Sequence, residues 1–300
     1  MVERNVFYPP FLYLGAEDGI AKKLIEKVSN PPDDVSPYLM LRCLAWIGSE
    51  LAIQQFQQWR EHPPSWWGMS NLPPTEYTVE AGWELTTEGT RRDLYLATTY
   101  EIVQIGDGEW ATDRSSELAL HEPHEGRCGW CGRQLVTLLR LDLRDQRLSF
   151  AAQDGSLLSV ARCPWCSTYT TLFTDIGLDG ASNWSDANDE RPLILDKIPD
   201  DGGEIEMEEL IQQAIALGAQ RRTPYEVVGR FMLDEPGISQ VGGHPDWIQD
   251  MEYPICPVCQ RRMICIAQIS WEDFEEYAEG STYAFACQED GKPATVYQQT

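Results

Sequence analysis

The stretch "CGWCGRQLVTLLRLD" at residues 128–142 begins with two cysteines in a short turn and continues as a strand-like run. A second pair stands in "CPWC" at 163–166, and 31 residues separate the two pairs. Two C-x2-C turns held together by a hairpin can aim four thiolates at one ion, which is the tetrahedral sulfur shell that zinc prefers. The spacing therefore predicts a structural metal site of the zinc-ribbon type. Its predicted ligands are Cys128, Cys131, Cys163 and Cys166.

Zinc (Zn2+) is the expected ion, although rubredoxin-type iron uses the same four-sulfur pattern. Four thiolates leave no open coordination position, so the site is expected to stabilise the fold and not to catalyse. A redox role for Cys128 and Cys131 leaves the second pair unexplained and lacks a βαβ context. His121 and His124 lie just upstream in "LHEPHEG" and could contribute to the site, but loop histidines are more often solvated.

A second stretch, "CPVCQRRMICIAQIS" at 256–270, aligns with residues 128–142 without a gap. Further on, "FACQEDGKPAT" at 285–295 aligns with "ARCPWCSTYTT" at 161–171, and 27 residues separate the second set of knuckles. The two alignments predict an internal repeat of two ribbon-like β modules.

The second module has an aspartate where the fourth cysteine of the first stands. Its candidate ligands are Cys256, Cys259, Cys287 and Asp290. Zinc accepts carboxylate oxygen, so a weaker Cys3Asp site is possible; alternatively, the site is empty and its cysteines pack as small apolar residues. Cys265 could replace the fourth ligand, but it aligns with Thr137 inside a strand, which favours a core position. One zinc ion is expected and a second is possible.

Apolar residues recur at helical spacing in "DDVSPYLMLRCLAWIGSELAIQQFQQWREHPP", which predicts two short helices broken near Gly48. A preceding helix is expected in "AEDGIAKKLIEKVSN", ending at Asn30 before a proline. The stretch "LAWIGSELAI" resembles one unit of a HEAT-type helical repeat, which must pack on something else to bury both faces. Trp66 and Trp67 follow in a proline-rich loop, either as an exposed binding pair or as caps of the helical module.

After the first cysteine pair the period becomes two, and strands are expected in "RQLVTLLRLDL", "RLSFAAQ", "SLLSVAR" and "TYTTLFTDI". Residues 186–209 contain ten carboxylates against two basic residues. A helix is expected over 204–222, with carboxylates at its start and Arg221 and Arg222 at its end, as the helix dipole favours.

The predicted fold class is α+β, with an N-terminal helical, HEAT-like unit followed by two pseudo-repeated zinc-ribbon-like β modules. The predicted parts are a helical module at 1–70, a β module with the first ribbon at 71–180, an acidic linker and helix at 181–237, and the second β module at 238–300.

Composition limits the function. The chain has 300 residues and a formal net charge of −25, which repels nucleic-acid phosphate and attracts cationic partners; alternatively, the acidic surface only keeps the protein soluble. Its nine cysteines stand mostly in short pairs, which favours metal over disulfides. No run of about 18 apolar residues and no signal-peptide pattern is visible, so we expect a cytoplasmic protein without membrane association.

The last 60 residues resemble the YwqG-like family of bacterial proteins of unknown function, and more distantly the programmed-cell-death-2 family of ribosomal-protein chaperones. The residues that carry the resemblance are Gly242, Gly243, Pro245, Trp247, Met263, Gln268, Phe285 and Cys287. Similar bacterial sequences usually close with a complete C-x2-C, whereas this chain has Asp290. The resemblance implies a β-rich, pseudo-repeated fold and a role in binding another protein, and it carries no catalytic residues.

Among function classes, no nucleophile elbow, zinc-protease motif, P-loop or dinucleotide fingerprint is present, so we expect no enzyme. The features favour a zinc-stabilised, acidic protein that binds a basic partner, either as an immunity protein against a toxin or as a dedicated chaperone for a ribosomal-type client. The alternatives are a metal-containing hydrolase and a nucleic-acid-associated zinc ribbon. The candidate partner-binding residues are Trp66, Trp67, Asp186, Asp189, Glu190, Asp200, Asp201 and Trp247.

Overall fold

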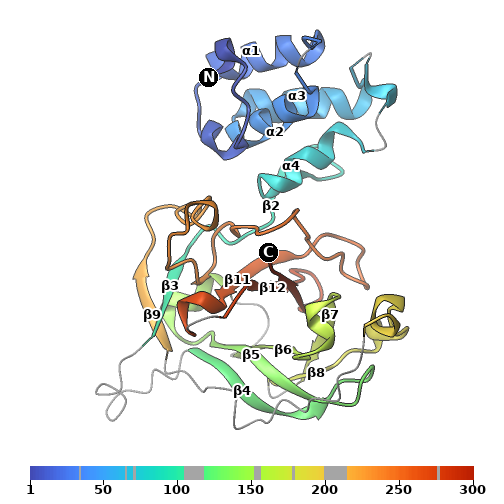
Figure 1. Cartoon of the computed structure of the whole chain (residues 1–300), viewed down its shortest axis with the longest axis vertical. Coiled ribbons are helices and arrows are strands. Elements are labelled where there is room, and N and C mark those ends of the chain that lie inside the picture. The colour runs from blue at the N-terminus through green and yellow to red at the C-terminus, as the bar shows by residue number, and fades with distance from the viewer. Residues whose placement is uncertain are drawn as a thin grey trace. The chain divides into compact units, whose positions relative to one another are not determined.

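A computed structural model describes residues 1–33, 35–64, 66–69, 72–104, 118–151, 157–177, 180–198, 215–275 and 278–300. They form two compact units, Met1–Leu94 and Tyr95–Thr300 (Figure 1). The first unit is mainly helical and the second is mainly β-sheet, so the α+β class is confirmed. The four-part division at residues 70, 180 and 237 stays a prediction. Among the described residues, no helix combines the length and apolarity needed to cross a bilayer.

The first unit contains the helices that the sequence predicts. The elements are η1 (Val2–Arg4), η2 (Pro10–Tyr13), α1 (Asp18–Ser29), α2 (Pro37–Ile47), α3 (Glu50–Glu61), η3 (Trp67–Met69), η4 (Pro74–Glu76), α4 (Tyr77–Glu80), β1 (Trp83–Leu85) and β2 (Arg91–Asp93). Gly48 ends α2 in the left-handed conformation that glycine adopts at little cost. Ser49 then caps α3 by accepting a hydrogen bond from the backbone of Ala52. Cys43 is fully buried in this helical core.

The second unit consists of two sheets. Its strands are β3 (Tyr100–Gln104), β4 (Leu118–Arg127), β5 (Gln134–Asp142), β6 (Leu157–Arg162), β7 (Leu172–Ile176), β8 (Ser182–Trp184), β9 (Ile215–Gln220), β10 (Gln240–Val241), β11 (Ile264–Ser270), β12 (Ser281–Ala286) and β13 (Pro293–Gln298). One sheet has the order β8-β7-β13-β12-β11-β10-β3-β9 and the other β4-β5-β6. Both enclose one apolar core, to which β5 contributes Leu139, β9 contributes Ile215 and β11 contributes Ile266 (Figure 1).

Hairpins β5-β6 and β11-β12 have the same strand register. Val136 pairs with Arg162 in the first hairpin, and the aligned Ile264 pairs with Ala286 in the second. The register of β5-β6 shifts between Thr137 and Leu139, and that of β11-β12 shifts between the aligned Cys265 and Ala267. A β-bulge at the same place bends both hairpins alike. The strands that precede the two hairpins also pair in the same register. Leu120 on β4 pairs with Leu139, and Val241 on β10 pairs with the aligned Ala267.

The helix predicted over 204–222 is wrong for the residues that the structure describes. Residues 215–220 form strand β9, which pairs with β3 and buries Ile215 and Leu217 alternately against the core. The burial of every second side chain against the core outweighs the local charge pattern, which favours a helix. Residues 204–214 lie outside the described part.

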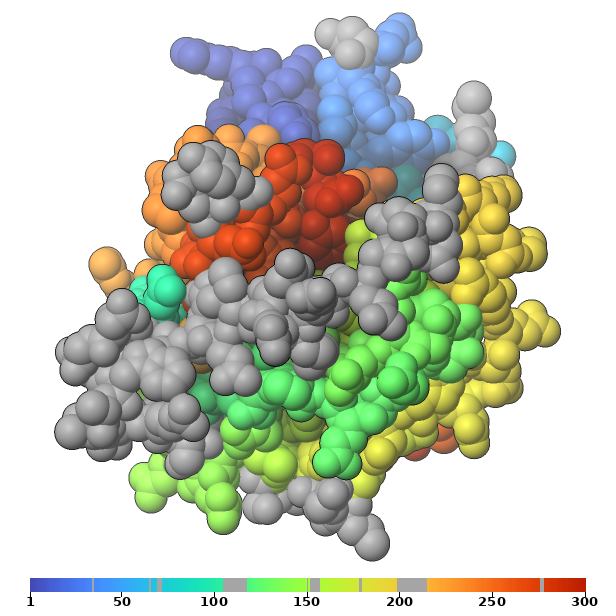
Figure 2. Space-filling model, turned by 60° about the horizontal axis from the view of Figure 1, so that its bottom comes forward, coloured from blue at the N-terminus to red at the C-terminus, as the bar shows by residue number. Residues whose placement is uncertain are grey.

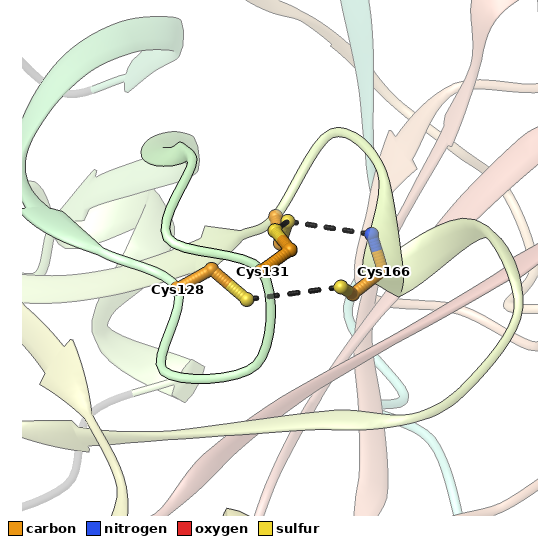
Figure 3. Close-up of side chains that lie close together, drawn as sticks. Cys128, Cys131 and Cys166 are labelled. Carbon is orange, nitrogen blue, oxygen red and sulfur yellow. Dashed lines mark hydrogen bonds between the residues drawn. The ribbon is translucent and has the colours of Figure 1, made fainter. Parts of the chain in front are cut away.

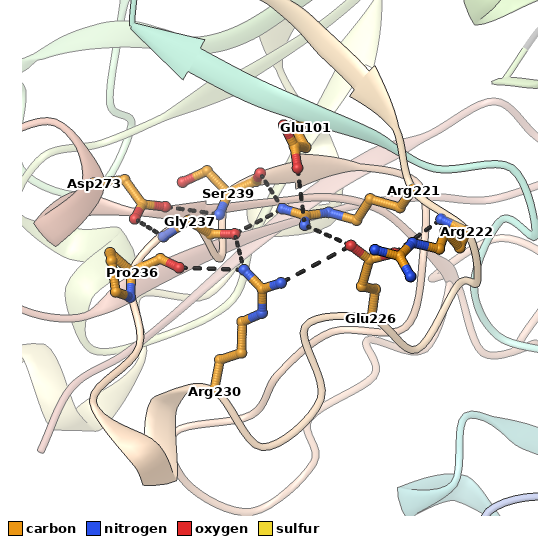
Figure 4. Close-up of polar contacts among 9 residues, drawn as sticks. All are labelled: Glu101, Arg221, Arg222, Glu226, Arg230, Pro236, Gly237, Ser239 and Asp273. Atoms are coloured by element: carbon orange, nitrogen blue, oxygen red, sulfur yellow. Dashed lines mark hydrogen bonds and ion pairs between the residues drawn. The ribbon is translucent and has the colours of Figure 1, made fainter.

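Arg221 follows β9 and is a buried anchor, not a helix-closing charge (Figure 4). Its side chain is 1% exposed and lies 3.4 Å from Glu101 Oε1. It also donates a 2.7 Å hydrogen bond to the carbonyl of Gly237, whose own amide donates to Asp273. This network ties β9 to the chain that leads into β10.

The strand predicted in "RLSFAAQ" is also wrong. Its described residues, 147–151, lie in the 3-10 helix η5 (Gln146–Ala151), and residues 152–153 lie outside the described part. The Asp145 side chain accepts a 2.8 Å hydrogen bond from the backbone of Arg147, and the Asp145 carbonyl accepts another from Leu148. These local bonds compete with sheet pairing and favour a turn.

Strand β8 leads into two 3-10 helices, η7 (Asp186–Asn188) and η8 (Leu193–Asp196). This segment lies beside the three-stranded sheet on the surface of the second unit, where the yellow residues border the green strands in Figure 2. The two are joined by a 2.7 Å hydrogen bond between His124 Nε2 and the carbonyl of Ser182. The segment therefore covers the end of the sheet that carries the first cysteine pair.

Candidate metal centres

The four predicted ligands of the first ribbon come together (Figure 3). Cys128 and Cys131 lie on one turn, where the Cys128 carbonyl accepts a 2.8 Å hydrogen bond from Gly132 and the Cys128 amide donates to the Arg133 carbonyl. Gly132 has a φ of +77°, the left-handed conformation that closes this knuckle. On the facing turn the amide of Cys166 donates to the sulfur of Cys163. Backbone donors aimed at sulfur stabilise a thiolate.

The sulfur positions fit a tetrahedral ion. A zinc–sulfur bond of about 2.3 Å in a tetrahedron requires sulfur atoms about 3.8 Å apart. The sulfurs of Cys128 and Cys166 are 3.8 Å apart and those of Cys131 and Cys163 are 3.6 Å apart. All four lie within 4.8 Å of one another. The group could therefore hold one metal ion in a closed shell of four protein ligands.

The second group repeats this geometry with one oxygen. The sulfurs of Cys259 and Cys287 are 3.5 Å apart, and Asp290 Oδ2 lies 3.3 Å from the sulfur of Cys256 and 3.4 Å from that of Cys287. One zinc–oxygen bond and one zinc–sulfur bond predict an oxygen–sulfur separation of about 3.5 Å. Cys265 lies buried in β11 and belongs to neither group. The carboxylate thus stands where a fourth ligand is needed.

The second knuckle also has the backbone of the first. The amide of Cys256 donates to the Arg261 carbonyl at 2.8 Å, and the Cys256 carbonyl accepts from Gln260 at 2.9 Å. Gln260 has a φ of 60° and occupies the place of Gly132. Two sequences therefore build the same knuckle, one with glycine and one with a side chain at the left-handed position.

The ligands influence one another's ionisation. Hydrogen bonds from Cys128 and Cys166 lower the pKa of Cys163, while the hydrogen bond to Cys163 raises the pKa of Cys128 to about 12. In the second group, hydrogen bonds from the cysteine thiols lower the pKa of Asp290, and burial raises the pKa of Cys287 to about 12. A dication favours the ionised form of every ligand, so metal binding at either group releases protons.

The first knuckle is covered by the segment that follows β8. The indole Nε1 of Trp130, between the first two cysteines, donates a 2.8 Å hydrogen bond to the carbonyl of Asn188. A methyl group on Gly129 would lie 2.7 Å from the indole of Trp184, so only glycine allows this approach. Asn188 in turn bonds both backbone groups of Phe173. Asn188 and Trp184 support the knuckle, yet their isolated positions offer no spacing signal in the sequence.

Neither upstream histidine belongs to the cysteine groups. His124 bonds the carbonyl of Ser182, and its Nδ1 accepts a 2.8 Å hydrogen bond from the amide of Gly126. His121 stacks on Trp271 with ring centroids 4.5 Å apart. Both rings are partly buried and packed, which differs from the solvated state that the sequence favours.

The predicted partner-binding residues have different surroundings. Trp66 and Trp67 are half-buried and pack around Tyr38, and the Trp66 indole donates to the carbonyl of Val28. Trp247 is half-buried among aromatic rings of its own unit. The exposed candidates are Asp186, Asp189 and Glu190. Asp200 and Asp201 lie outside the described residues.

The chain is similar to one bacterial protein across nearly its whole length. It is 32% identical over 294 residues to a protein of Salmonella typhimurium (strain LT2) named uncharacterized protein YpfL. The aligned region makes up 97% of this chain and 65% of that protein, so the chain spans less than two thirds of this relative. No family model and no solved structure matches the chain. The resemblance to the YwqG-like and programmed-cell-death-2 families stays a prediction.

Proposed function

We propose that this chain is a non-enzymatic, zinc-stabilised protein that binds a basic protein partner through its acidic surface. One observation carries the proposal: the segment that covers the first knuckle presents exposed acidic residues to solvent. Trp130 and Asn188 fix this segment to the knuckle, and Asp186, Asp189 and Glu190 are exposed on it. The closed four-ligand groups support a structural role for the metal, since no ligand position stays open for catalysis.

Apolar side chains next to these carboxylates strengthen the proposal. Leu193 is 78% exposed and Ile194 is 45% exposed, both on η8 of the same segment. Binding surfaces combine an apolar contact with charges that select the partner and speed its association. With a net charge of −25, the chain repels nucleic acid and attracts cationic proteins. The partner is therefore a basic protein, namely a toxin that the chain neutralises or a ribosomal-type client that it escorts.

We further propose that the two ribbons are copies of one module. The shared register, the bulge at the same place and the matching knuckle hydrogen bonds support this proposal. The likeness of α2 and α3 to one HEAT-type unit is likewise a proposal, supported by the two short helices that meet at Gly48.

A charge-reversal experiment tests the binding function. The test variant replaces three exposed carboxylates of the covering segment with lysine, namely Asp186, Asp189 and Glu190. The matched control makes the same change at three exposed carboxylates of the first unit, Glu17, Glu26 and Glu61. Both variants change the net charge by the same amount. If the binding surface is local, only the test variant should lose the partner.

The readouts separate the two kinds of partner. Rescue of cells from a toxin encoded beside this gene identifies an immunity protein, and quantitative pull-down of a basic ribosomal protein identifies a chaperone. In both assays we expect the test variant to fail, the control to retain activity, and zinc removal to abolish binding. Equal loss in both variants would contradict a local surface, and turnover of a small molecule without any partner would contradict the binding function.

A further inference from the structure

Among the described side chains of the second unit that have buried nitrogen atoms without hydrogen-bond partners, two lie against Trp271. The His121 ring stacks on the indole at 4.5 Å, and its Nε2 is buried and unpaired. The guanidinium carbon of Arg162 lies 4.8 Å from the centre of the same indole, and its Nε is also buried and unpaired. One aromatic platform thus brings together a histidine from β4 and an arginine from β6.

Arg162 forms no ion pair with a carboxylate among the residues that the structure describes, and the nearest negative charge is the Cys163 thiolate. Its side chain makes one hydrogen bond, 3.4 Å long, from Nη1 to the hydroxyl of Thr282. The neighbouring ionisable groups that act on it are the phenol of Tyr297 and the thiol of Cys163, and neither is a carboxylate. A guanidinium removed from water is costly unless an anion compensates it. The arrangement therefore favours a further anionic partner that accepts hydrogen bonds from the guanidinium.

The backbone at His121 points to the same conclusion. His121 has a φ of 55°, a conformation that favours glycine, and the aligned position of the second hairpin is Gly242 with a φ of 76°. Likewise, the position of Arg162 corresponds to Ala286. The first ribbon module therefore keeps a strained histidine on β4 and, on β6, an arginine without a carboxylate partner, where the second module has Gly242 and Ala286. Strain of this kind is a sign of function at the site where it is observed.

A further polar group lies on the same side. Thr295 pairs with Ala284, two residues from Thr282 on β12, so the side chains of Thr282 and Thr295 share one face of the sheet. The hydroxyl of Thr295 is buried and unpaired. Burial, together with the charge of Arg162, lowers the pKa of His121 to about 3, so its ring is neutral at physiological pH and can donate a hydrogen bond.

We propose that Arg162 and His121 bind a small oxyanion, a carboxylate or a phosphate, inside the β unit. The guanidinium supplies the charge and a forked pair of donors, and the neutral imidazole supplies a further hydrogen bond. Both residues are partly exposed to solvent, although the two unpaired nitrogens are themselves buried. Neither residue is a metal ligand or part of the acidic segment, although Arg162 directly precedes the ligand Cys163.

Isothermal titration of the full zinc-loaded chain tests the proposal, with inorganic phosphate and acetate as probes at constant ionic strength. We expect millimolar or tighter binding of one ion per chain, and Arg162→Ala should weaken it at least tenfold. Arg162→Lys keeps the charge but loses the fork, so its affinity should fall between the two. Arg144→Ala is the matched control, because this arginine is 75% exposed and pairs with Asp142 on the surface. It should bind as the unmodified chain does.

His121→Gly is the second test variant, and it should also weaken binding at least tenfold. Arg162→Ala and His121→Gly introduce the residues that stand at the corresponding positions of the second module, Ala286 and Gly242. Folding should therefore persist, and an unchanged zinc content would verify that it does. Tighter binding of phosphate supports a phosphorylated ligand, and tighter binding of acetate supports a carboxylate. Absence of binding of both probes, or equal affinity in Arg162→Ala and the unmodified chain, overturns the proposal.

Discussion

Replacing Asp290 with alanine tests whether a carboxylate completes the second metal group. The Asp290 oxygen lies 3.3 Å from the sulfur of Cys256 and 3.4 Å from that of Cys287, close to the separation expected for two ligands of one zinc ion. Asp290→Ala leaves three thiolates and opens one coordination position to water. The effect should be confined to the second group.

The expected loss of zinc-binding free energy follows from the removal of one ligand out of four. Structural zinc contributes about 10–16 kcal/mol in small zinc-binding peptides, so one ligand of four accounts for about 3 kcal/mol. That free energy corresponds to an increase in Kd of about 100-fold. Asp290→Cys should have the opposite effect and tighten the site, because zinc prefers a fourth thiolate.

Chelator competition at constant pH measures this affinity. The two zinc ions of the unmodified chain should leave in two steps, so the affinity of each group can be followed separately. The matched control is Glu289→Ala, which removes the same charge one residue away. Glu289 pairs with Arg261 at 2.6 Å on the surface and belongs to neither group. The account predicts that only Asp290→Ala shifts the weaker step. An equal shift in both variants, or no shift in either, would refute Asp290 as a ligand.

Three further predictions concern the first knuckle and the strand β4 that precedes it. Gly129→Ala should destabilise the chain by about 1–3 kcal/mol, because the new methyl displaces the indole of Trp184, and a changed tryptophan emission should accompany the loss in chemical denaturation. Gly132→Ala meets no atom within 4 Å but holds alanine at a φ of +77°, so it should cost about 1–2 kcal/mol without that emission change. Burial depresses the pKa of His121 to about 3, so the unfolded chain binds a proton here below pH 6.5 and stability falls as pH drops towards 3. His121 should account for about 2 kcal/mol lost between pH 7 and pH 5, and an identical pH dependence in His121→Gly would contradict this assignment.

The cysteine spacing was enough to predict which side chains meet at both metal groups. Two C-x2-C turns joined by a hairpin have few ways to pack, and the register of Cys287 against Cys163 places Asp290 beside three thiols. The helices around Gly48 were also predictable, because apolar periodicity and a left-handed glycine act locally.

Features that depend on tertiary burial were not predictable. Residues 215–220 follow a run of carboxylates that suggests a helix, and only the exposed edge of β3 and the core beneath it make them a strand. The pairing of His121 with Arg162 over Trp271 joins three distant parts of the chain. No short-range pattern in the sequence marks such a contact.

Elemental analysis of the purified chain tests most directly whether the two groups hold structural zinc. We expect two zinc ions per chain, one for each group. We also expect one zinc ion for a Cys131→Ala variant, together with lower stability. A folded chain that contains no zinc, or a Cys131→Ala variant that keeps both ions, would contradict this expectation.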